Sequence, residues 1–186
     1  MDFLIILAGP KHSGKTCIGR QLAKLLSIRF YDLDQLIEEQ SGQSVRVLYK
    51  AGKEFFQEET TALECLLQKK KFEEEKSRGA VLALGGGIID NPGAMAVLKK
   101  ELQKSERYRI VCLEVSAETA WQRIVGRGEL PPFLMAENPA ASKEKHRLLH
   151  ERRANDYKKI ASFSILAEGK SAVELAARLS VLLTEK

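Results

Sequence analysis

The chain has 186 residues, of which 44% are hydrophobic and 30% are charged, and its formal net charge is +5. This balance is that of a globular protein, and the length favours one domain with a core of its own. No apolar run approaches the roughly 20 residues that cross a bilayer, so we expect no membrane segment and a cytoplasmic location. The basic residues form no single stripe, which favours a small anionic partner over nucleic acid.

Buried strands alternate with amphipathic helices along the chain. Phe3–Ala8 is a continuous apolar run that stops at a glycine, which predicts a strand covered on both faces. Apolar residues at helical spacing then predict a helix over Lys15–Leu26. Further strands are expected at Ile28–Tyr31, Ala80–Leu84, Arg109–Val115 and Ser162–Leu166. Further helices are expected at Asp34–Gln40, Ser44–Lys50, Lys53–Lys76 and Lys143–Lys159, after the N-caps Asn91 and Ser116, and after a capping box of Ser171 and Glu174.

This order of elements predicts the fold class. Strands that alternate with helices form a parallel sheet whose crossovers cover both faces. We therefore expect a single three-layer α/β/α domain over residues 1–186, with a five-stranded parallel sheet and ligands at the carboxyl ends of its strands. Residues 126–142 contain three prolines and are expected to form a mobile loop.

The first predicted strand leads into a complete Walker A motif. Its glycines let peptide N–H groups turn toward phosphate oxygens, and the following helix adds the positive end of its dipole. Lys15 offers a cation for the β- and γ-phosphates, and the Thr16 hydroxyl suits Mg²⁺. The nucleotide-binding residues expected from this motif are Gly9, Pro10, Lys11, His12, Ser13, Gly14, Lys15, Thr16 and the adjoining Cys17. His12 is expected to face solvent and not to act as a catalyst.

Two more groups of polar or flexible residues follow the second and third predicted strands. Asp32 and Asp34 lie two apart, and in an extended segment such residues face the same way. Beside a P-loop they suit Mg²⁺ and an acceptor hydroxyl, although such a pair also occurs as a solvated strand end or helix cap. The run Gly85–Gly87 exceeds what one tight turn needs and indicates a close approach of the backbone to a ligand, with a plain turn as the alternative.

At these three motifs the chain resembles a shikimate kinase. The Walker A segment, Phe30-Tyr31-Asp32-x-Asp34 and Val81-Leu82-Ala83-x-Gly85-Gly86-Gly87 have that family's order and spacing. The resemblance continues through Leu113–Ser116 to Arg153-x-x-x-Tyr157-x-x-x-Ala161 and covers nearly the whole chain. It implies a P-loop kinase fold and transfer of the ATP γ-phosphoryl group to shikimate, which gives shikimate 3-phosphate for aromatic amino acid biosynthesis.

On the nucleotide side, the resemblance implies that Lys15 and Thr16 hold ATP and Mg²⁺, with Asp32 in the magnesium shell. Arg123 would cover the adenine ring, assisted by the loop around Glu168–Ser171. Residues 126–142 would form the lid that closes over the phosphates.

On the acceptor side, the resemblance implies that Asp34 binds the acceptor hydroxyls and orients or deprotonates the attacking one. The backbone of Gly85, Gly86 and Gly87 would line this site, and Arg153 would pair with the acceptor carboxylate.

The chain departs from the family pattern at two places. Aligned on Phe56, Gln57 stands where an arginine should bind the acceptor carboxylate, and Thr60 stands where the glutamate partner of that arginine should be. The lid pattern Arg-Pro-Leu-Leu is replaced by a segment that begins at Pro131, so the lid arginine is missing, and Arg127 is the candidate to take over its catalytic role.

These departures leave the acceptor open. Shikimate is the leading acceptor, another polyol or sugar acid such as gluconate is the second, and a nucleotide-binding module with weakened catalysis is the third. A small hydroxy acid is the expected partner, and the protein is expected to be a monomer.

Overall fold

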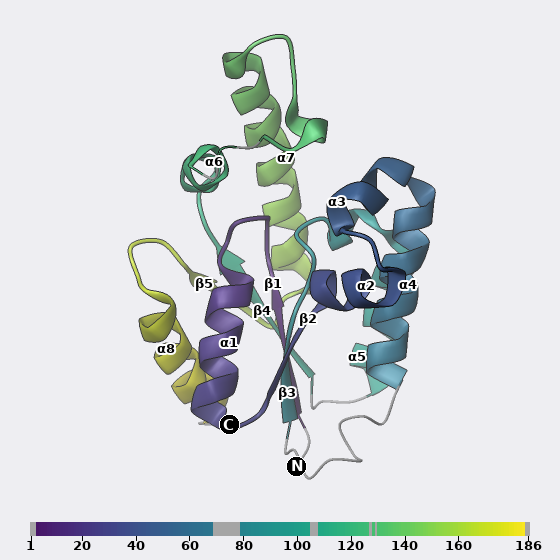
Figure 1. Ribbon diagram of the computed structural model, residues 1–186. Coiled ribbons are helices and arrows are strands. Elements are labelled where there is room, and N and C mark those ends of the chain that lie inside the picture. Colours follow the sequence, from purple (N-terminus) through teal and green to yellow (C-terminus); the bar gives the residue numbers. More distant parts are fainter. Residues whose placement is uncertain (1–2, 69–78, 105–107, 127, 129, 185–186) are drawn as a thin grey trace.

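The computed structural model describes residues 3–68, 79–104, 108–126, 128 and 130–184. Its strands form one parallel sheet in the order β2-β3-β1-β4-β5, which confirms the predicted five-stranded parallel sheet (Figure 1). The strands are β1 (Phe3–Ala8), β2 (Arg29–Asp32), β3 (Gly79–Ala83), β4 (Tyr108–Glu114) and β5 (Phe163–Leu166). Because β1 pairs with β3 on one side and β4 on the other, the loop after it lies in the middle of the carboxyl edge.

Helices cover both faces of this sheet, as expected for a three-layer fold. α1 (Lys15–Leu26) and α8 (Ala172–Thr184) pack together on one face, whereas α4 (Lys53–Gln68) and α5 (Pro92–Lys104) pack together on the other (Figure 1). The remaining helices are α2 (Leu33–Ser41), α3 (Val45–Leu48), α6 (Ala117–Val125) and α7 (Pro139–Ile160), with 3₁₀ turns η1 (Tyr49–Ala51), η3 (Ile88–Asp90) and η4 (Pro132–Leu134).

The alternation of side chains along β1 joins the sheet to both layers. Ile5 and Leu7 belong to a buried cluster that includes residues of α1 and α8. Leu4 and Ile6 point the other way, into a cluster that includes residues of α4, α5 and α7. Each of these four side chains is almost fully buried and contributes roughly 1.5–3 kcal/mol of burial free energy. The apolar run therefore holds the layers together and fixes the position of the loop that follows.

The helix starts follow the capping residues read from the sequence. Ser116 Oγ accepts a hydrogen bond from the Thr119 N–H at 3.1 Å, and Asn91 Oδ1 accepts one from the Gly93 N–H at 3.1 Å. Ser171 and Glu174 form the reciprocal capping box, in which the Ser171 N–H donates to Glu174 Oε2 at 2.7 Å. Such caps satisfy backbone N–H groups that have no partner within the helix.

One predicted boundary differs from the structure by more than two residues, and another lies outside the described residues. The long helix expected over Lys53–Lys76 is described as far as Gln68, and its remainder lies outside the described residues. The loop expected over residues 126–142 ends earlier than predicted, because α7 begins at Pro139 and Asn138 caps it by accepting from the Ala141 N–H at 2.8 Å. An N-cap Asn followed by Pro at the first helical position favours that start.

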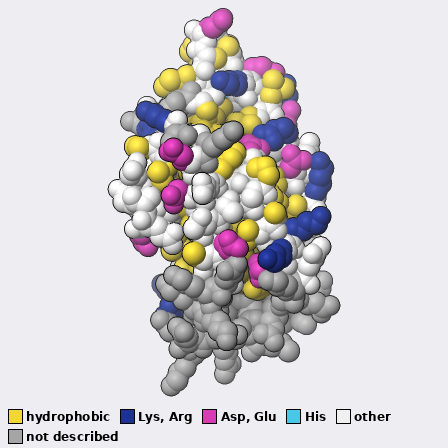
Figure 2. All heavy atoms as spheres, turned by 90° about the vertical axis from the view of Figure 1, so that its right-hand side faces the viewer, with side chains coloured by type: hydrophobic (Ala, Val, Ile, Leu, Met, Phe, Trp, Pro, Cys, Tyr) yellow, Lys and Arg dark blue, Asp and Glu magenta, His cyan; other side chains and the backbone are white. Residues whose placement is uncertain are grey.

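The face of the molecule drawn in Figure 2 carries charged side chains of both signs. On the face drawn in Figure 2, acidic and basic side chains are interspersed among those shown in colour. In the part of the chain that the structure describes, no helix has the length and apolar character needed to cross a membrane.

Candidate active site

The Walker A segment forms a tight loop between β1 and α1. Gly9 has a φ of 139°, and a Cβ added there would lie 2.6 Å from the Leu113 carbonyl oxygen on β4. Gly14, with a φ of 97°, is the N-cap of α1. Both glycines are therefore required by the backbone, and the loop directs the amino end of α1 toward the carboxyl edge of the sheet, where an anion is stabilised.

Lys15 is held inside this loop. Its Nζ donates to the carbonyl oxygens of Gly9 and Pro10, each at 2.9 Å. Burial lowers the pKa of Lys15 to about 8, against the raising effect of Asp34 and Asp32. A buried ammonium whose charge is disfavoured is prepared for a polyanion, because the negative charge of phosphates stabilises its protonated form.

Thr16 and Asp32 meet directly beside Lys15. Thr16 Oγ1 donates to Asp32 Oδ2 at 2.7 Å, and Asp32 Oδ1 caps α2 by accepting from the Asp34 N–H at 3.1 Å. The expected extended segment containing both aspartates is wrong, because Asp32 ends β2 whereas Asp34 is in the first turn of α2. The two carboxylates nevertheless lie close enough for the Asp32 charge to act on Asp34. A hydroxyl and a carboxylate together are a donor set that suits Mg²⁺.

Asp34 and Glu59 flank Gly85. A Cβ added at Gly85 would lie 2.8 Å from Asp34 Oδ1 and 3.0 Å from Glu59 Oε1, so only glycine leaves room for both carboxyl groups. Burial, followed by the Asp32 charge, raises the pKa of Asp34. Burial also raises the pKa of Glu59 to about 7, although a hydrogen bond from Asn91 Nδ2 at 2.9 Å acts against this. The pKa of Glu59 is thereby close to neutral pH, and that of Asp34 is shifted in the same direction, which makes each carboxylate a stronger base once it is ionised.

The second glycine of the run joins the acceptor side to the P-loop. A Cβ added at Gly86 would lie 2.8 Å from both the Cα and the N atom of Lys11. The buried Tyr157 hydroxyl fixes the same loop from the other side, since it donates to the Gly85 carbonyl oxygen at 3.1 Å. Gly85 and Gly86 therefore allow close approach of the backbone to other groups of the protein, and the approach of a ligand to this run stays a prediction.

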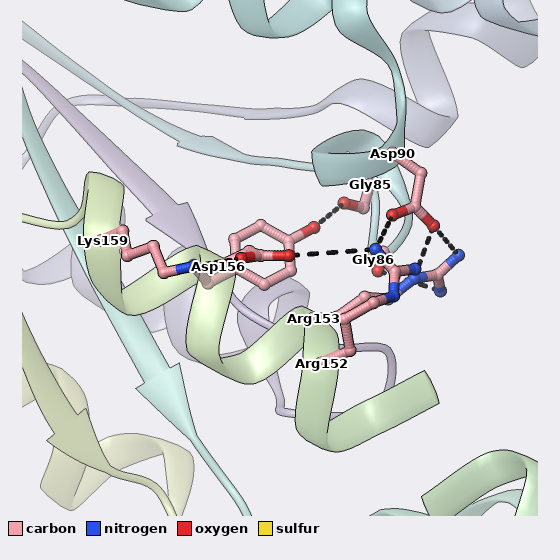
Figure 3. A network of polar contacts seen from close by, with 8 residues as sticks. Gly85, Gly86, Asp90, Arg152, Arg153, Asp156 and Lys159 are labelled. Atoms are coloured by element: carbon pink, nitrogen blue, oxygen red, sulfur yellow. Dashed lines mark hydrogen bonds and ion pairs between the residues drawn. The ribbon is translucent and has the colours of Figure 1, made fainter. Parts of the chain in front are cut away.

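Arg153 reaches this loop from α7 (Figure 3). Its Nε and Nη2 donate to Asp90 Oδ2 at 2.9 and 2.7 Å, and the neighbouring Arg152 donates from Nη1 to Asp90 Oδ1 at 2.7 Å. Burial alone would raise the pKa of Asp90, but these two arginines outweigh it and hold the pKa below its usual value. Only 8% of the Arg153 side chain is exposed, so Asp90 balances a charge that is largely removed from water.

Arg123 connects α6 to the P-loop. Its Nη1 donates to the His12 carbonyl oxygen at 2.7 Å, and His12 itself has a left-handed φ of 64°. Glu168 Oε1 accepts from the Ser116 N–H at 2.6 Å, which brings the loop after β5 to the start of the same helix. Cys17 is exposed on α1.

One cavity of about 420 Å³ runs between the P-loop and the acceptor-side residues. Its polar lining includes Asp34, Glu59 and Arg153 together with the backbone of the triple glycine.

Tyr49 and Phe55 supply an aromatic wall of this cavity, with ring centroids 5.5 Å apart. The charged lining is completed by Lys11, Glu38, Arg46 and Lys50. The volume and the mixture of carboxylates, cations and aromatic rings suit a small, polar, hydroxylated anion.

The sequence alignment on Phe56 chose the wrong face of α4. Gln57 is exposed and does not line the cavity, and Thr60 Oγ1 donates instead to the Phe56 carbonyl oxygen at 2.7 Å. Phe55 and Glu59 are the residues of α4 that line the cavity. They have the same four-residue spacing as the phenylalanine and glutamate of the family pattern, but begin one residue earlier than we aligned them.

The segment predicted to form the lid contributes to one side of the cavity. Pro131 and Phe133 line it, and the Phe133 ring contacts Tyr49 with centroids 5.3 Å apart. The side chain at position 131 is therefore apolar where the family pattern has an arginine. Arg127, the sequence-based candidate for that role, lies outside the described residues.

The sequence analysis missed four residues that shape the site: Tyr49, Glu59, Asp90 and Tyr157. Tyr157 was part of the pattern that carries the family resemblance and could have been assigned as the anchor of the glycine loop. Asp90 gives no signal of its own, because its partner Arg153 is 63 residues away in the sequence.

A parallel α/β sheet, a Walker A loop at the end of its central strand and a second polar site in the same cavity define a P-loop phosphotransferase. The model of the shikimate kinase family matches residues 11–183. The shikimate kinase of Lactococcus lactis is 33% identical to this chain over 172 residues, which cover 92% of each of the two chains. The shikimate kinase of Vibrio parahaemolyticus is 31% identical, over 98% of this chain and 96% of the relative. A solved structure of shikimate kinase from Acinetobacter baumannii in complex with shikimate has 31% identity and a TM-score of 0.80, over 100% of this chain and 96% of that one.

The chain therefore belongs to the shikimate kinase family. It is an ATP-dependent kinase by membership in that family, and the predicted P-loop kinase fold is confirmed.

Proposed function

We propose that this protein transfers the γ-phosphoryl group of ATP to a hydroxyl of shikimate and releases ADP and shikimate 3-phosphate. The observation that carries the proposal is that residues of the P-loop and the acceptor-side residues Asp34, Glu59 and Arg153 line the same cavity. Relatives named shikimate kinase over nearly the whole chain and the shikimate complex of the Acinetobacter enzyme support this acceptor.

The P-loop binds the phosphates of ATP. The backbone N–H groups of residues 9–17 and the amino end of α1 surround the β-phosphate, and Lys15 moves from its loop carbonyls to the β- and γ-phosphate oxygens. Arg123 and the loop at Glu168 form the adenine side, because Glu168 binds the backbone at the start of α6 and Arg123 of the same helix binds the P-loop carbonyl of His12.

Thr16 and Asp32 are the residues that would hold Mg²⁺, with the carboxylate acting directly or through water. The ion would neutralise charge on the β- and γ-phosphates during transfer. Asp32 also caps α2, so the same side chain ties the metal site to the helix that carries Asp34.

Asp34 accepts the proton of the attacking hydroxyl. The new bond forms between the acceptor oxygen and the γ-phosphorus, the bond from phosphorus to the ADP oxygen breaks, and the hydroxyl proton passes to the Asp34 carboxylate. The raised pKa of Asp34 makes it a better proton acceptor than an exposed aspartate. Its place beside Gly85 keeps it in the cavity, next to Glu59.

The acceptor carboxylate is bound by Arg153, with Arg46 and Lys50 adding positive charge from the α3–η1 side of the cavity. Asp90 neutralises part of the Arg153 charge but leaves N–H groups of Nη1 and Nη2 directed at the glycine loop. One chain supplies both halves of the site, so we also propose that the protein acts as a monomer, in the cytoplasm where ATP is available.

The direct test is ATP-dependent phosphorylation of a panel of hydroxy acids, with product identified by mass spectrometry. Shikimate should be used with a kcat/KM at least tenfold above that of gluconate or quinate. Asp34→Asn should lower kcat with shikimate by about 10²–10⁴ and leave ATP affinity within threefold, because a general base is lost and the P-loop is intact. A tenfold preference for gluconate would give the activity to the second candidate, and ATP binding without turnover of any acceptor would favour a nucleotide-binding module.

A further inference from the structure

The lid offers no cation to the phosphates over residues 130–138, because this segment contains neither Lys nor Arg. Pro131 and Phe133 line the cavity there. A phosphoryl-transfer site nevertheless has to offset the charge that spreads over the equatorial oxygens in the transition state. Beside Lys15 and Mg²⁺, a cation in place of the lid arginine would offset part of this charge.

Lys11 occupies the junction between the two halves of the cavity. Its backbone packs against Gly86 on the acceptor side, whereas its neighbours in sequence belong to the phosphate loop. Lys11 and Pro131 both line the main cavity, and both also line a smaller adjoining cavity of about 20 Å³ beneath the lid. Lys11 therefore borders the same space as the residue that replaces the lid arginine.

The cavity brings Lys11 close to the reacting groups on both sides. Lys11 lines it together with Asp34 and Gly86 of the acceptor side, and it belongs to the same loop as the phosphate-binding Lys15. A cation at this place lies between the nucleotide and the acceptor.

The other cations that line this cavity are assigned to other ligands or lie elsewhere. Arg153 is assigned to the acceptor carboxylate, and Arg46 and Lys50 enter from α3 and η1 and do not line the smaller cavity. Lys15 is assigned to the β- and γ-phosphates from inside the loop. Lys11 is also held in place from behind, because Arg123 binds the carbonyl of the adjoining His12.

We propose that Lys11 is a catalytic residue that binds the transferring phosphoryl oxygens in the transition state and replaces the missing lid arginine. This inference rests on the proposed phosphoryl transfer. The ammonium group keeps its proton throughout: the hydroxyl proton goes to Asp34, and Lys11 contributes only positive charge and hydrogen bonds. Because the charge on the equatorial oxygens develops during transfer, the contact strengthens in the transition state more than in the ATP complex.

The test compares Lys11→Ala, Lys11→Arg and Arg127→Ala with a matched control, Lys24→Ala, which removes an exposed lysine from the far end of α1. Lys11→Ala should lower kcat by about 10²–10³, as loss of one preorganised donor does, and leave ADP affinity within threefold. Lys11→Arg should retain at least a tenth of wild-type kcat. Lys24→Ala should match the wild type, and Arg127→Ala should lose less than tenfold.

A second measurement separates transition-state binding from ground-state binding and needs no turnover. ADP with aluminium fluoride mimics the transferring group, and Lys11→Ala should bind this mimic more weakly by a factor close to its loss of kcat, relative to ADP alone. Equal binding of the mimic by wild type and Lys11→Ala would overturn the proposal, and so would a loss of kcat seen in Arg127→Ala but not in Lys11→Ala. If wild type uses no acceptor at all, the proposed function fails, and the mimic still decides the role of Lys11.

Discussion

The nucleotide half and the acceptor half of the cavity are built in different ways. The phosphate-binding part of the nucleotide half comes from one continuous segment, and every residue that the Walker A pattern requires is present in it. The acceptor half is assembled from α2, the α3–η1 turn, α4, the loop after β3 and α7. One of the two departures from the family pattern was assigned to α4 of this half, and the other lies in the predicted lid segment at Pro131. A site made by one loop depends on the geometry of that loop, whereas a composite site lets one element change its residues while the others keep theirs.

In both halves, burial disfavours the charged form of a functional side chain, although the charges have opposite signs. Burial disfavours the positive charge of Lys15 on one side and the negative charges of Asp34 and Glu59 on the other. Each half therefore gains when a ligand of complementary charge or hydrogen-bonding capacity enters. The empty site therefore lowers the folding stability of the free protein, because buried charges without a ligand cost free energy.

The largest expected effect tests the nucleotide half. Lys15→Ala should lower turnover by about 10³, because it removes a preorganised cation from the phosphates. The melting temperature without nucleotide should change little, since a charge that burial disfavours is lost together with two hydrogen bonds. ATP should raise the melting temperature of the wild type and fail to do so in the variant. Scanning calorimetry with and without MgATP measures both quantities.

The lowered pKa of Lys15 predicts that the affinity for nucleotide depends on pH. Phosphate binding requires the protonated amine, and in the free protein that form is lost as the pH rises through about 8. The affinity of wild type for ADP should therefore fall above pH 8, and Lys15→Ala should show weak binding with no such dependence. An ADP affinity in Lys15→Ala equal to that of wild type would contradict the assignment of the loop.

The next effect tests the acceptor half through stability. The pKa of Glu59 is raised from 4.5 to about 7, so the folded state binds a proton that the unfolded state releases in that range. The contribution of Glu59 to stability is therefore most favourable below pH 4.5 and is lost as the pH rises to about 7. Glu59→Gln keeps an acceptor for Asn91 Nδ2 and should be the more stable protein at pH 8, by up to about 3 kcal/mol.

Urea denaturation of both proteins at pH 5 and pH 8 measures this difference. The gap in unfolding free energy between Glu59→Gln and wild type should widen from pH 5 to pH 8. Asn91→Ala is the matched variant, because it leaves Glu59 buried without its hydrogen bond and should destabilise the protein at both pH values. A gap that is the same at pH 5 and pH 8 would mean that Glu59 is ionised normally and is in contact with water.

The two halves also differ in how far the sequence could predict them. Strand Phe3–Ala8, the Walker A loop and helix Lys15–Leu26 are local patterns, and the structure has them at the predicted bounds. The glycine run was interpreted as close approach of the backbone to a ligand, whereas the structure shows its close approach to Asp34, Glu59 and Lys11, which depends on contacts between distant segments. Asp90 could not be found, because its role exists only once α7 lies against the turn after β3.

The register of α4 shows why the composite half was harder to predict. Phe55 and Phe56 are adjacent, and either can be aligned with the phenylalanine of the family pattern. Packing decides between them: Phe55 is 5% exposed and belongs to the core, whereas Phe56 is only partly buried against it. A shift of one residue turns a helix by about 100°, which moves Gln57 out of the cavity and brings Glu59 into it.

The smallest expected effect follows from that register. Gln57→Arg restores the residue type that the family pattern has after its phenylalanine, and on the sequence alignment it should improve the binding of shikimate. In the structure Gln57 is exposed and does not line the cavity, so the new guanidinium should remain in water and leave the KM for shikimate within twofold. Arg46→Ala, which removes a cation that does line the cavity, should raise that KM by about tenfold, the equivalent of 1.4 kcal/mol. Steady-state kinetics of the two variants beside wild type therefore decides which element supplies positive charge to the acceptor. A tenfold lower KM in Gln57→Arg would show that α4 presents its other face in the working enzyme, and the acceptor half would then have kept the family's arrangement after all.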